Sequence, residues 1–210
     1  MSFYRPEYYR HGRKMKGFET LLFIALIFTF FSSNVNRTVA AGNEVRSETL
    51  RLHIIANSDS EADQNLKIKV RDAVLEATGE LFAEVSGKTE AVAAAEYSSD
   101  DIKAIAEKVI AEEGFDYSVQ VEVTEMWFET RSYEGFTLPA GDYDAVRIII
   151  GAGEGKNWWC VMYPALCVPG AEADVVEKYG ENAAFLTGNG YEIRFALIEW
   201  IERLRNLFVK

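Results

Sequence analysis

The hydrophobic pattern that begins at residue 50 predicts a strand followed by a long helix. Residues 50–56 (LRLHIIA) are apolar and β-branched with partial alternation, which is typical of a strand. Residues 66–81 place apolar side chains at helical spacing, and the charged side chains fall mostly on the other side. Ser60 is a favourable N-cap, and Ser58 offers a second start two residues earlier. We therefore predict an amphipathic helix over about 60–84.

The rest of the chain continues with further helical and extended patterns. Gly114 suits the position just after a helix, and the alternation of valine with polar residues after it predicts a half-buried strand. The predicted elements are a helical segment at 88–96, a helix from residue 98 or 99 to 113, strands at 117–128, 144–150 and 158–163 with a loop at 129–142, and helices at 172–179 and 193–208.

This order of elements predicts an α+β fold. Written in its simplest form it is β-α-α-β-β-β-α, which favours a two-layer sandwich with helices packed on one face of a mixed, largely antiparallel sheet. The strands at 144–150 and 158–163 are joined by a short connection, so we expect them to be antiparallel neighbours.

The N-terminus has the features of an export signal. Five basic residues precede Leu21–Phe31, an apolar run of eleven residues, and Val39-Ala40-Ala41 offers small residues for cleavage. We predict that residues 1–41 are a signal peptide or, alternatively, a retained anchor. Residues 42–210 are then a single extracytoplasmic domain, because the positive charge precedes the apolar run.

Charge narrows the range of partners. The whole chain has a net charge of −11, and the 16 basic and 31 acidic residues after position 41 give residues 42–210 a net charge of −15. A body with this charge repels nucleic acids and anionic lipid surfaces. We expect no nucleic-acid partner and contact with a membrane only through the N-terminal segment.

The stretch GAGEGK at 151–156 resembles a phosphate-binding loop only superficially. A P-loop needs glycine where Ile150 stands and Ser or Thr where Asn157 stands, and the dinucleotide pattern fails at Lys156. Both motifs also open a helix, whereas NWWCVMY follows here and is typical of a strand. We interpret the glycines as a hairpin turn and predict no cofactor.

Cys160 and Cys167 are the two cysteines of the chain. In an exported protein such a pair favours a disulfide, and Pro164 between them could turn the chain; two buried thiols are the alternative. Zinc would require two further ligands, and the histidines are His11 and His53, so we predict no metal site.

Candidate catalytic residues are few. His53 is the histidine that remains after removal of residues 1–41, and a hydrolase would have to pair it with Asp59 or Asp63 in the polar cluster after the first strand. Those aspartates are equally explained as groups that complement the positive end of the helix. Consecutive positions in a strand place Trp158 and Trp159 on opposite faces, and one of them could contact a partner.

Two segments resemble the stage II sporulation protein R family: RLHIIANSDSEADQNLKIKVRDAVLE at 51–76 and NWWCVMYPALC at 157–167. The resemblance covers essentially residues 50–210, with a mild departure at Glu61, where proline is expected. The signature residues are Arg51, His53, Ala56, Asn57, Ser58, Asp59, Asp63, Gln64, Lys67, Lys69, Val70, Arg71, Asp72, Asn157, Trp158, Trp159, Cys160, Pro164 and Cys167.

The resemblance implies a signalling function rather than catalysis. Members of the family are made in the forespore and exported into the space between the two sporulation membranes. There they trigger a membrane-embedded aspartic protease of the mother cell, which removes the pro-sequence of sigma factor E. The alternatives from the residues alone are an extracytoplasmic hydrolase that uses His53 and a secreted module that binds a small molecule.

Overall fold

The computed structural model describes residues 17–133, 136–164, 166, 179, 186–187, 199–200 and 203. The chain divides into two compact units, Met1–Arg37 and Thr38–Lys210. The sequence predictions for a short helix at 172–179 and a final helix at 193–208 lie almost entirely outside the described residues.

Helix α1 (Gly17–Ser47) contains the apolar run. Its side chains from Phe18 to Phe30 include a series of large apolar groups that are at least half exposed. Among the residues whose placement is described, no helix has the length and apolar character that a membrane crossing needs. The signal peptide or anchor at residues 1–41 stays a prediction. Residues 38–47 at the end of α1 belong to the second unit, where Val45 and Arg46 are buried.

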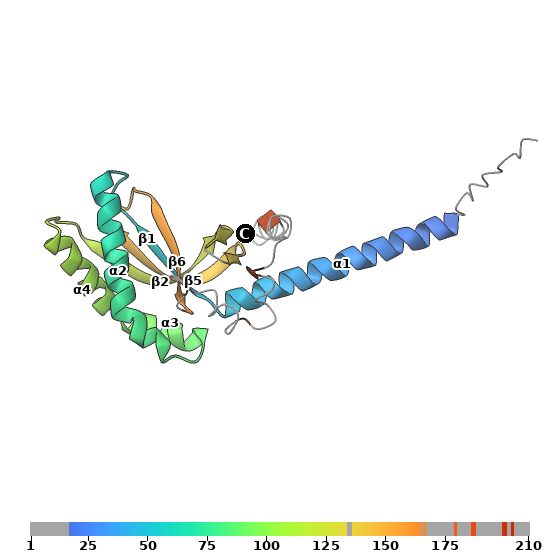
Figure 1. Ribbon diagram of the computed structural model, residues 1–210, viewed down its shortest axis with the longest axis horizontal. Coiled ribbons are helices and arrows are strands. Elements are labelled where there is room, and N and C mark those ends of the chain that lie inside the picture. The colour runs from blue at the N-terminus through green and yellow to red at the C-terminus, as the bar shows by residue number, and fades with distance from the viewer. Residues whose placement is uncertain are drawn as a thin grey trace, which may run out of the picture. The chain divides into compact units, whose positions relative to one another are not determined.

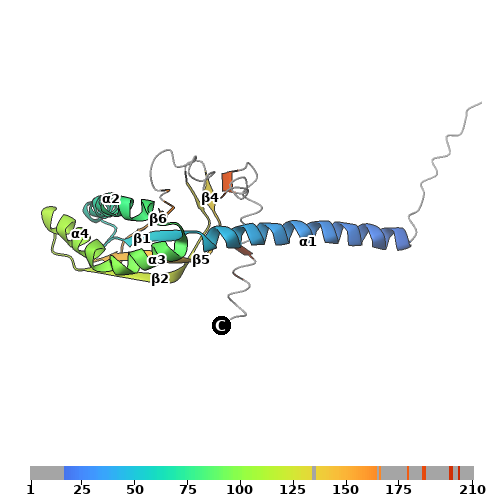
Figure 2. The ribbon, with the colours of Figure 1, turned by 90° about the horizontal axis from the view of Figure 1, so that it is seen from below.

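The second unit is built on a four-stranded mixed sheet. Its strands are β1 (Leu50–Ile55), β2 (Val119–Phe128), β5 (Gly141–Ile150) and β6 (Asn157–Tyr163), in the order β2-β5-β1-β6. β1 and β5 are parallel, and the other two pairs are antiparallel. Helices α2 (Glu61–Ala83), α3 (Lys88–Tyr97) and α4 (Ser99–Glu112) pack on one face (Figures 1 and 2). The predicted α+β class with helices on one face is confirmed.

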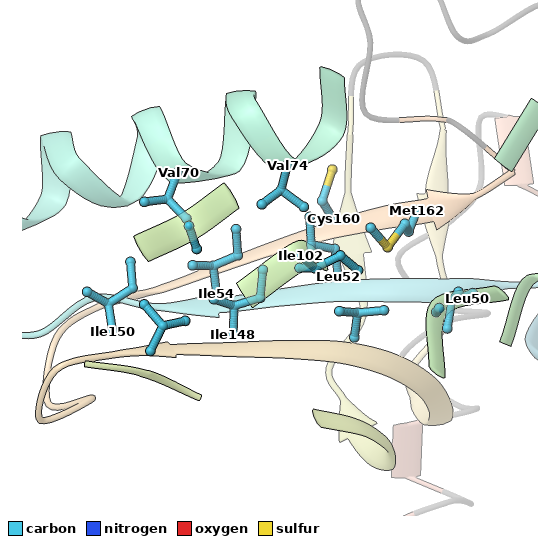
Figure 3. Packing of buried hydrophobic residues seen from close by; sticks show 14 of the residues in the cluster. Leu50, Leu52, Ile54, Val70, Val74, Ile102, Ile148, Ile150, Cys160 and Met162 are labelled. Carbon is cyan, nitrogen blue, oxygen red and sulfur yellow. The ribbon is translucent and has the colours of Figure 1, made fainter. Parts of the chain in front are cut away.

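The main core lies between the sheet and these helices. Alternate residues of β1 and β5, such as Leu52, Ile54 and Ile148, point towards α2 and α4 and are fully buried, as Figure 3 shows. They meet Val70 and other apolar residues that the sequence placed on one side of the helix at 60–84. Each such aliphatic side chain contributes about 1.5–3 kcal/mol through burial.

The predicted hairpin between β5 and β6 is wrong, because β1 lies between these two strands. All six residues of β1 are buried, and a strand of this kind is stable in the centre of a sheet, where it has a partner on each side. Residues 151–156 are long enough to pass over it, since two strand spacings are about 10 Å and six extended residues span about 20 Å. The short connection between β5 and β6 therefore does not require these two strands to pair directly.

The predicted loop at 129–142 contains more structure than its sequence indicates. It holds the short antiparallel strands β3 (Arg131–Ser132) and β4 (Thr137–Leu138). β5 also starts at Gly141, three residues before the predicted start. Tyr143 and Ala145 alternate with Asp142 and Asp144, and these two aspartates made the segment look like a loop in the sequence. Both apolar residues are buried on the sheet face opposite the helices.

Candidate functional site

The first signature segment, residues 51–76, meets the connection that precedes the second segment at the point where β1 ends and α2 begins. The β5–β6 connection, residues 151–156, passes over this point and is bonded to residues 56–67 of the first segment. We call this contact region the signature junction and define it as residues 56–67 together with residues 151–156. The junction includes the N-cap of α2, where Ser60 Oγ accepts a hydrogen bond from the Asp63 amide at 3.1 Å, as predicted.

Asp63 is the centre of the polar side of the junction. Its Oδ2 accepts the hydroxyl of Ser58 at 2.6 Å and the Nδ2 amide of Asn57 at 2.9 Å. These hydrogen bonds, that of Ser58 first, hold the pKa of the Asp63 carboxyl below its ordinary value although burial opposes them. Asp63 is 4% exposed, and its bonds to Asn57 and Ser58 give this buried carboxyl a structural role in the junction.

The connection between β5 and β6 is held by its own backbone amides. Asn57 accepts the Ala152 amide at 2.9 Å through Oδ1 and the Glu154 amide at 3.1 Å through its carbonyl. The Gly155 amide donates to the carbonyl of Ala56 at 2.9 Å. These N–H groups are used within the chain, which agrees with the sequence argument against a phosphate-binding loop. Gly151 and Gly153 adopt positive φ angles of 58° and 65°, the conformation that a turn asks of glycine.

Two further signature side chains complete the junction. Asp59 Oδ1 accepts the Lys156 amide at 2.7 Å. The Lys67 ammonium donates to the Lys156 carbonyl at 2.8 Å and to Gln64 Oε1 at 2.7 Å. Lys67 is 3% exposed, and burial is the main cause that lowers its pKa, against the attraction of Asp59. Both halves of NSDSEADQNLK thus hold a loop that follows about 90 residues later in the chain.

His53 lies on the opposite face of the sheet from the helices. Its ring stacks on Trp159 with centroids 3.9 Å apart, and its Nε2 donates to Asn157 Oδ1 at 2.8 Å. Burial, aided by the charge of Arg147, lowers the pKa of His53 although the Asn157 bond opposes the shift. The imidazole is 3% exposed and is bonded to an amide rather than to a carboxylate.

The pairing of His53 with an aspartate, which the hydrolase alternative requires, does not form among the described residues. Asp59 is bonded to the Lys156 amide and Asp63 to Asn57, Ser58 and the Ser60 cap. The residues that a hydrolase would use are therefore divided between two separate polar networks. The structure does not bring together the base and the orienting carboxylate of a triad.

Arg51 is the second polar signature residue on the His53 face, and it is fully buried. Its guanidinium lies 4.1 Å from the ring centroid of Phe128 and 5.0 Å from that of Tyr143, and Nε donates to the Cys160 carbonyl at 3.3 Å. Nη2 donates to the Tyr133 hydroxyl, while Nη1 has no hydrogen-bond partner among the described residues. Sequence reasoning missed this aromatic enclosure because Tyr133 stands in the predicted loop, where no periodicity indicates its direction.

The two tryptophans point to opposite faces of β6, as predicted. Trp158 packs against the helix-side core with the Arg71 guanidinium 4.4 Å from its ring centroid. Trp159 packs with Phe128 and His53 on the other face. Both rings are half-buried and engaged within the chain.

The remaining signature residues are distributed as follows. Val70 is buried in the core, Arg71 donates to Asp72, and Lys69 forms an ion pair with Glu113, the residue just after α4. Pro164 follows β6 after a cis peptide bond. Cys160 is 5% exposed in the core, whereas Cys167 lies outside the described residues, so the disulfide stays a prediction. Within the described part of the chain, no group of three or more acidic, histidine or cysteine side chains could hold a metal ion.

The fold and the site define an α+β protein in which the polar segment after β1, residues 56–67, holds the connection between β5 and β6. The family model of stage II sporulation protein R matches residues 46–173. Stage II sporulation protein R of Bacillus subtilis (strain 168) is 32% identical over 185 residues, which cover 76% of this chain and 83% of that protein. The chain belongs to the stage II sporulation protein R family, a family of sporulation signalling proteins. No solved structure matches the chain.

Proposed function

We propose that this chain is an exported sporulation signal that activates a membrane-embedded aspartic protease of the mother cell. The protease then removes the pro-sequence of the sigma factor E precursor. The observation that carries the proposal is membership of the stage II sporulation protein R family over residues 46–173. The N-terminal basic and apolar segments support export into the space between the forespore and mother-cell membranes.

The local geometry supports a role as activator rather than as enzyme. His53 is buried and bonded to an amide, and the nearest candidate carboxylates, Asp59 and Asp63, are committed to the signature junction. The polar residues that attract attention in the sequence therefore have structural partners. An activator needs a rigid surface, and a junction that fixes the crossing loop provides rigidity.

The proposal is tested by co-expression of three proteins in a host that does not form spores: the full chain, the membrane protease and the sigma factor E precursor. We expect cleavage of the precursor with the full chain and none with a variant that lacks residues 1–41. Absence of cleavage with the full chain, despite its accumulation outside the cytoplasm, would contradict the proposal.

A His53→Gln variant separates this function from hydrolysis. Glutamine retains an amide that can donate to Asn157 but cannot act as a general base. We expect the variant to support precursor cleavage at the level of the unsubstituted chain. Loss of cleavage by a variant that unfolds at the same denaturant concentration as the parent would favour the hydrolase alternative.

A further inference from the structure

Strand β2 forms one margin of the sheet, and its outer side has no partner among the described residues. All ten of its residues are in register with β5 on the inner side, from Val119 opposite Ile150 to Phe128 opposite Gly141. In an antiparallel strand every second residue directs its N–H and C=O groups away from the inner neighbour. β2 therefore presents a regular row of backbone donors and acceptors about 34 Å long. The strand runs along the edge of the sheet in Figure 2.

Apart from its two glutamates, β2 lacks the features that usually protect an edge strand. Its sequence, VQVEVTEMWF, contains no proline, glycine or lysine, and its pairing with β5 shows no bulge. Natural proteins generally shorten, bend or charge a free edge, because an unprotected one pairs with other strands. The other margin of the sheet differs: β6 has seven residues, and Cys160, Val161 and Tyr163 make further interactions.

The exposed charges of β2 indicate what kind of strand could pair with it. Glu122 and Glu125 are both exposed, and they lie on opposite faces of the sheet because three positions separate them. A second copy paired antiparallel about Val123 and Thr124 would place Glu122 opposite Glu125 of the other copy, and like charges in that position are destabilising. A net charge of −15 on residues 42–210 opposes self-association as well.

We propose that β2 is the docking edge for the partner protein, which adds an extended segment with basic side chains as a fifth strand. Backbone hydrogen bonds supply the affinity of such an addition, and the side chains of the added strand supply specificity. Glu122 already forms an ion pair with Arg147 of β5 at 2.9 Å, so the exposed carboxylate that a basic side chain of the added strand would meet is that of Glu125. The proposal rests on the proposed function, since it takes the external region of the membrane protease as the partner.

The test places a photo-crosslinking amino acid in the full chain within the co-expression host described above. The reporter positions are Glu125 on β2, Glu107 on the exposed side of α4, and Asn157 next to Trp159 on β6. We expect cross-linking to the external region of the protease from position 125 and none from position 107. Cross-linking from position 157 alone, with the precursor still cleaved, would overturn β2 as the docking edge and favour the face of β6 that carries Trp159. Failure of the unsubstituted chain to cause cleavage would instead refute the proposed function.

Substitutions supply a second, independent measurement. Glu125→Lys is expected to weaken binding to the protease's external region by about twofold to fivefold, because it places like charge against a basic strand. The matched variant Glu107→Lys changes the net charge equally and is expected to leave binding unchanged. Equal effects of the two variants would mean that only overall charge matters and would contradict a specific edge.

Proline at two consecutive positions tests the backbone itself. One of Val123→Pro and Thr124→Pro removes an N–H that bonds to β5, and the other removes an N–H that points outward. We expect one variant to unfold more easily and the other to keep the parental unfolding midpoint while losing at least tenfold in binding. If the proline variant that keeps the parental unfolding midpoint also keeps parental binding, strand addition at this edge is ruled out.

Discussion

The signature junction makes a sharp prediction at Gly155. A Cβ atom at this position would lie 2.2 Å from the Ser58 carbonyl oxygen and 2.6 Å from its carbon, which are backbone atoms that cannot rotate away. Gly155→Ala therefore requires the crossing loop to move by about 1 Å to reach an ordinary contact distance. A shift of that size breaks the amide bonds of Gly155 and Glu154, now 2.9 and 3.1 Å long.

The free-energy cost follows from the bonds affected. Two lost backbone hydrogen bonds cost about 2 kcal/mol, and weakening the neighbouring bonds to Asn57 and Asp59 adds about 1 kcal/mol. The lower entropy of an unfolded chain with alanine offsets about 0.5–1 kcal/mol. The net loss in the free energy of unfolding is about 2 kcal/mol, which lowers the melting temperature of a domain of this size by about 4–8 °C.

Gly79 provides the matched control for this substitution. It lies in the exposed interior of α2, and a Cβ there would meet nothing within 4 Å. Because alanine has the higher helix propensity, Gly79→Ala should stabilise the chain by about 1 kcal/mol. The measurement is thermal unfolding of the purified full-length chain followed by circular dichroism. Equal shifts of the two variants, or stabilisation by Gly155→Ala, would refute the close loop packing.

Three further predictions follow from buried groups. The folded state holds the His53 pKa below its ordinary value of 6.5. As the pH falls below 6.5, the unfolded chain therefore binds a proton at His53 more readily than the folded chain does, and the free energy of unfolding declines. His53→Gln should flatten this part of a plot of unfolding free energy against pH. Arg51→Met should change the free energy of unfolding by no more than about 1 kcal/mol, because an apolar side chain of similar length removes a buried charge. Arg51→Ala should cost about 3 kcal/mol because it leaves a cavity. A large loss with methionine would indicate that the charge of Arg51 has a further partner in the folded chain. Mass spectrometry of the exported chain should detect a peptide that joins Cys160 to Cys167, and alkylation of both thiols without reduction would exclude that link.

The sequence was a good guide wherever the decisive interactions are local. The strand at 50–56, the Ser60 cap and the apolar side of α2 all follow from periodicity and capping within a few residues. The opposite directions of Trp158 and Trp159 follow from the alternation of a strand. The rejection of the phosphate motifs was likewise local, because those motifs have a fixed spacing and a fixed structural context.

Prediction failed where the result depends on which strand lies beside which. The connection at 151–156 has the length and the glycines of a hairpin, and neither feature reveals that β1 is inserted between its two strands. The contact of Ala152 with Asn57 joins residues 95 positions apart, so no local pattern reports it. The role of Asn57 as a loop anchor, and that of Lys67 as its buried support, became visible only with the sheet order.

The same crossing explains why the polar cluster after β1 has the residue types of an active site. A loop that passes over the end of a central strand shields the last carbonyls of that strand, and the amides of the loop, from water. Each of these backbone groups must therefore find a hydrogen-bond partner within the chain. Asn57, Asp59 and Lys67 provide these partners with both charged and neutral groups. Such a cluster needs carboxylates, amides and an ammonium close together, which is also the composition of many catalytic sites. The hydrogen bonds decide what these groups do: Oδ2 of Asp63 and the ammonium of Lys67 are already bonded within the chain, and both groups therefore stabilise the junction between α2 and the crossing loop.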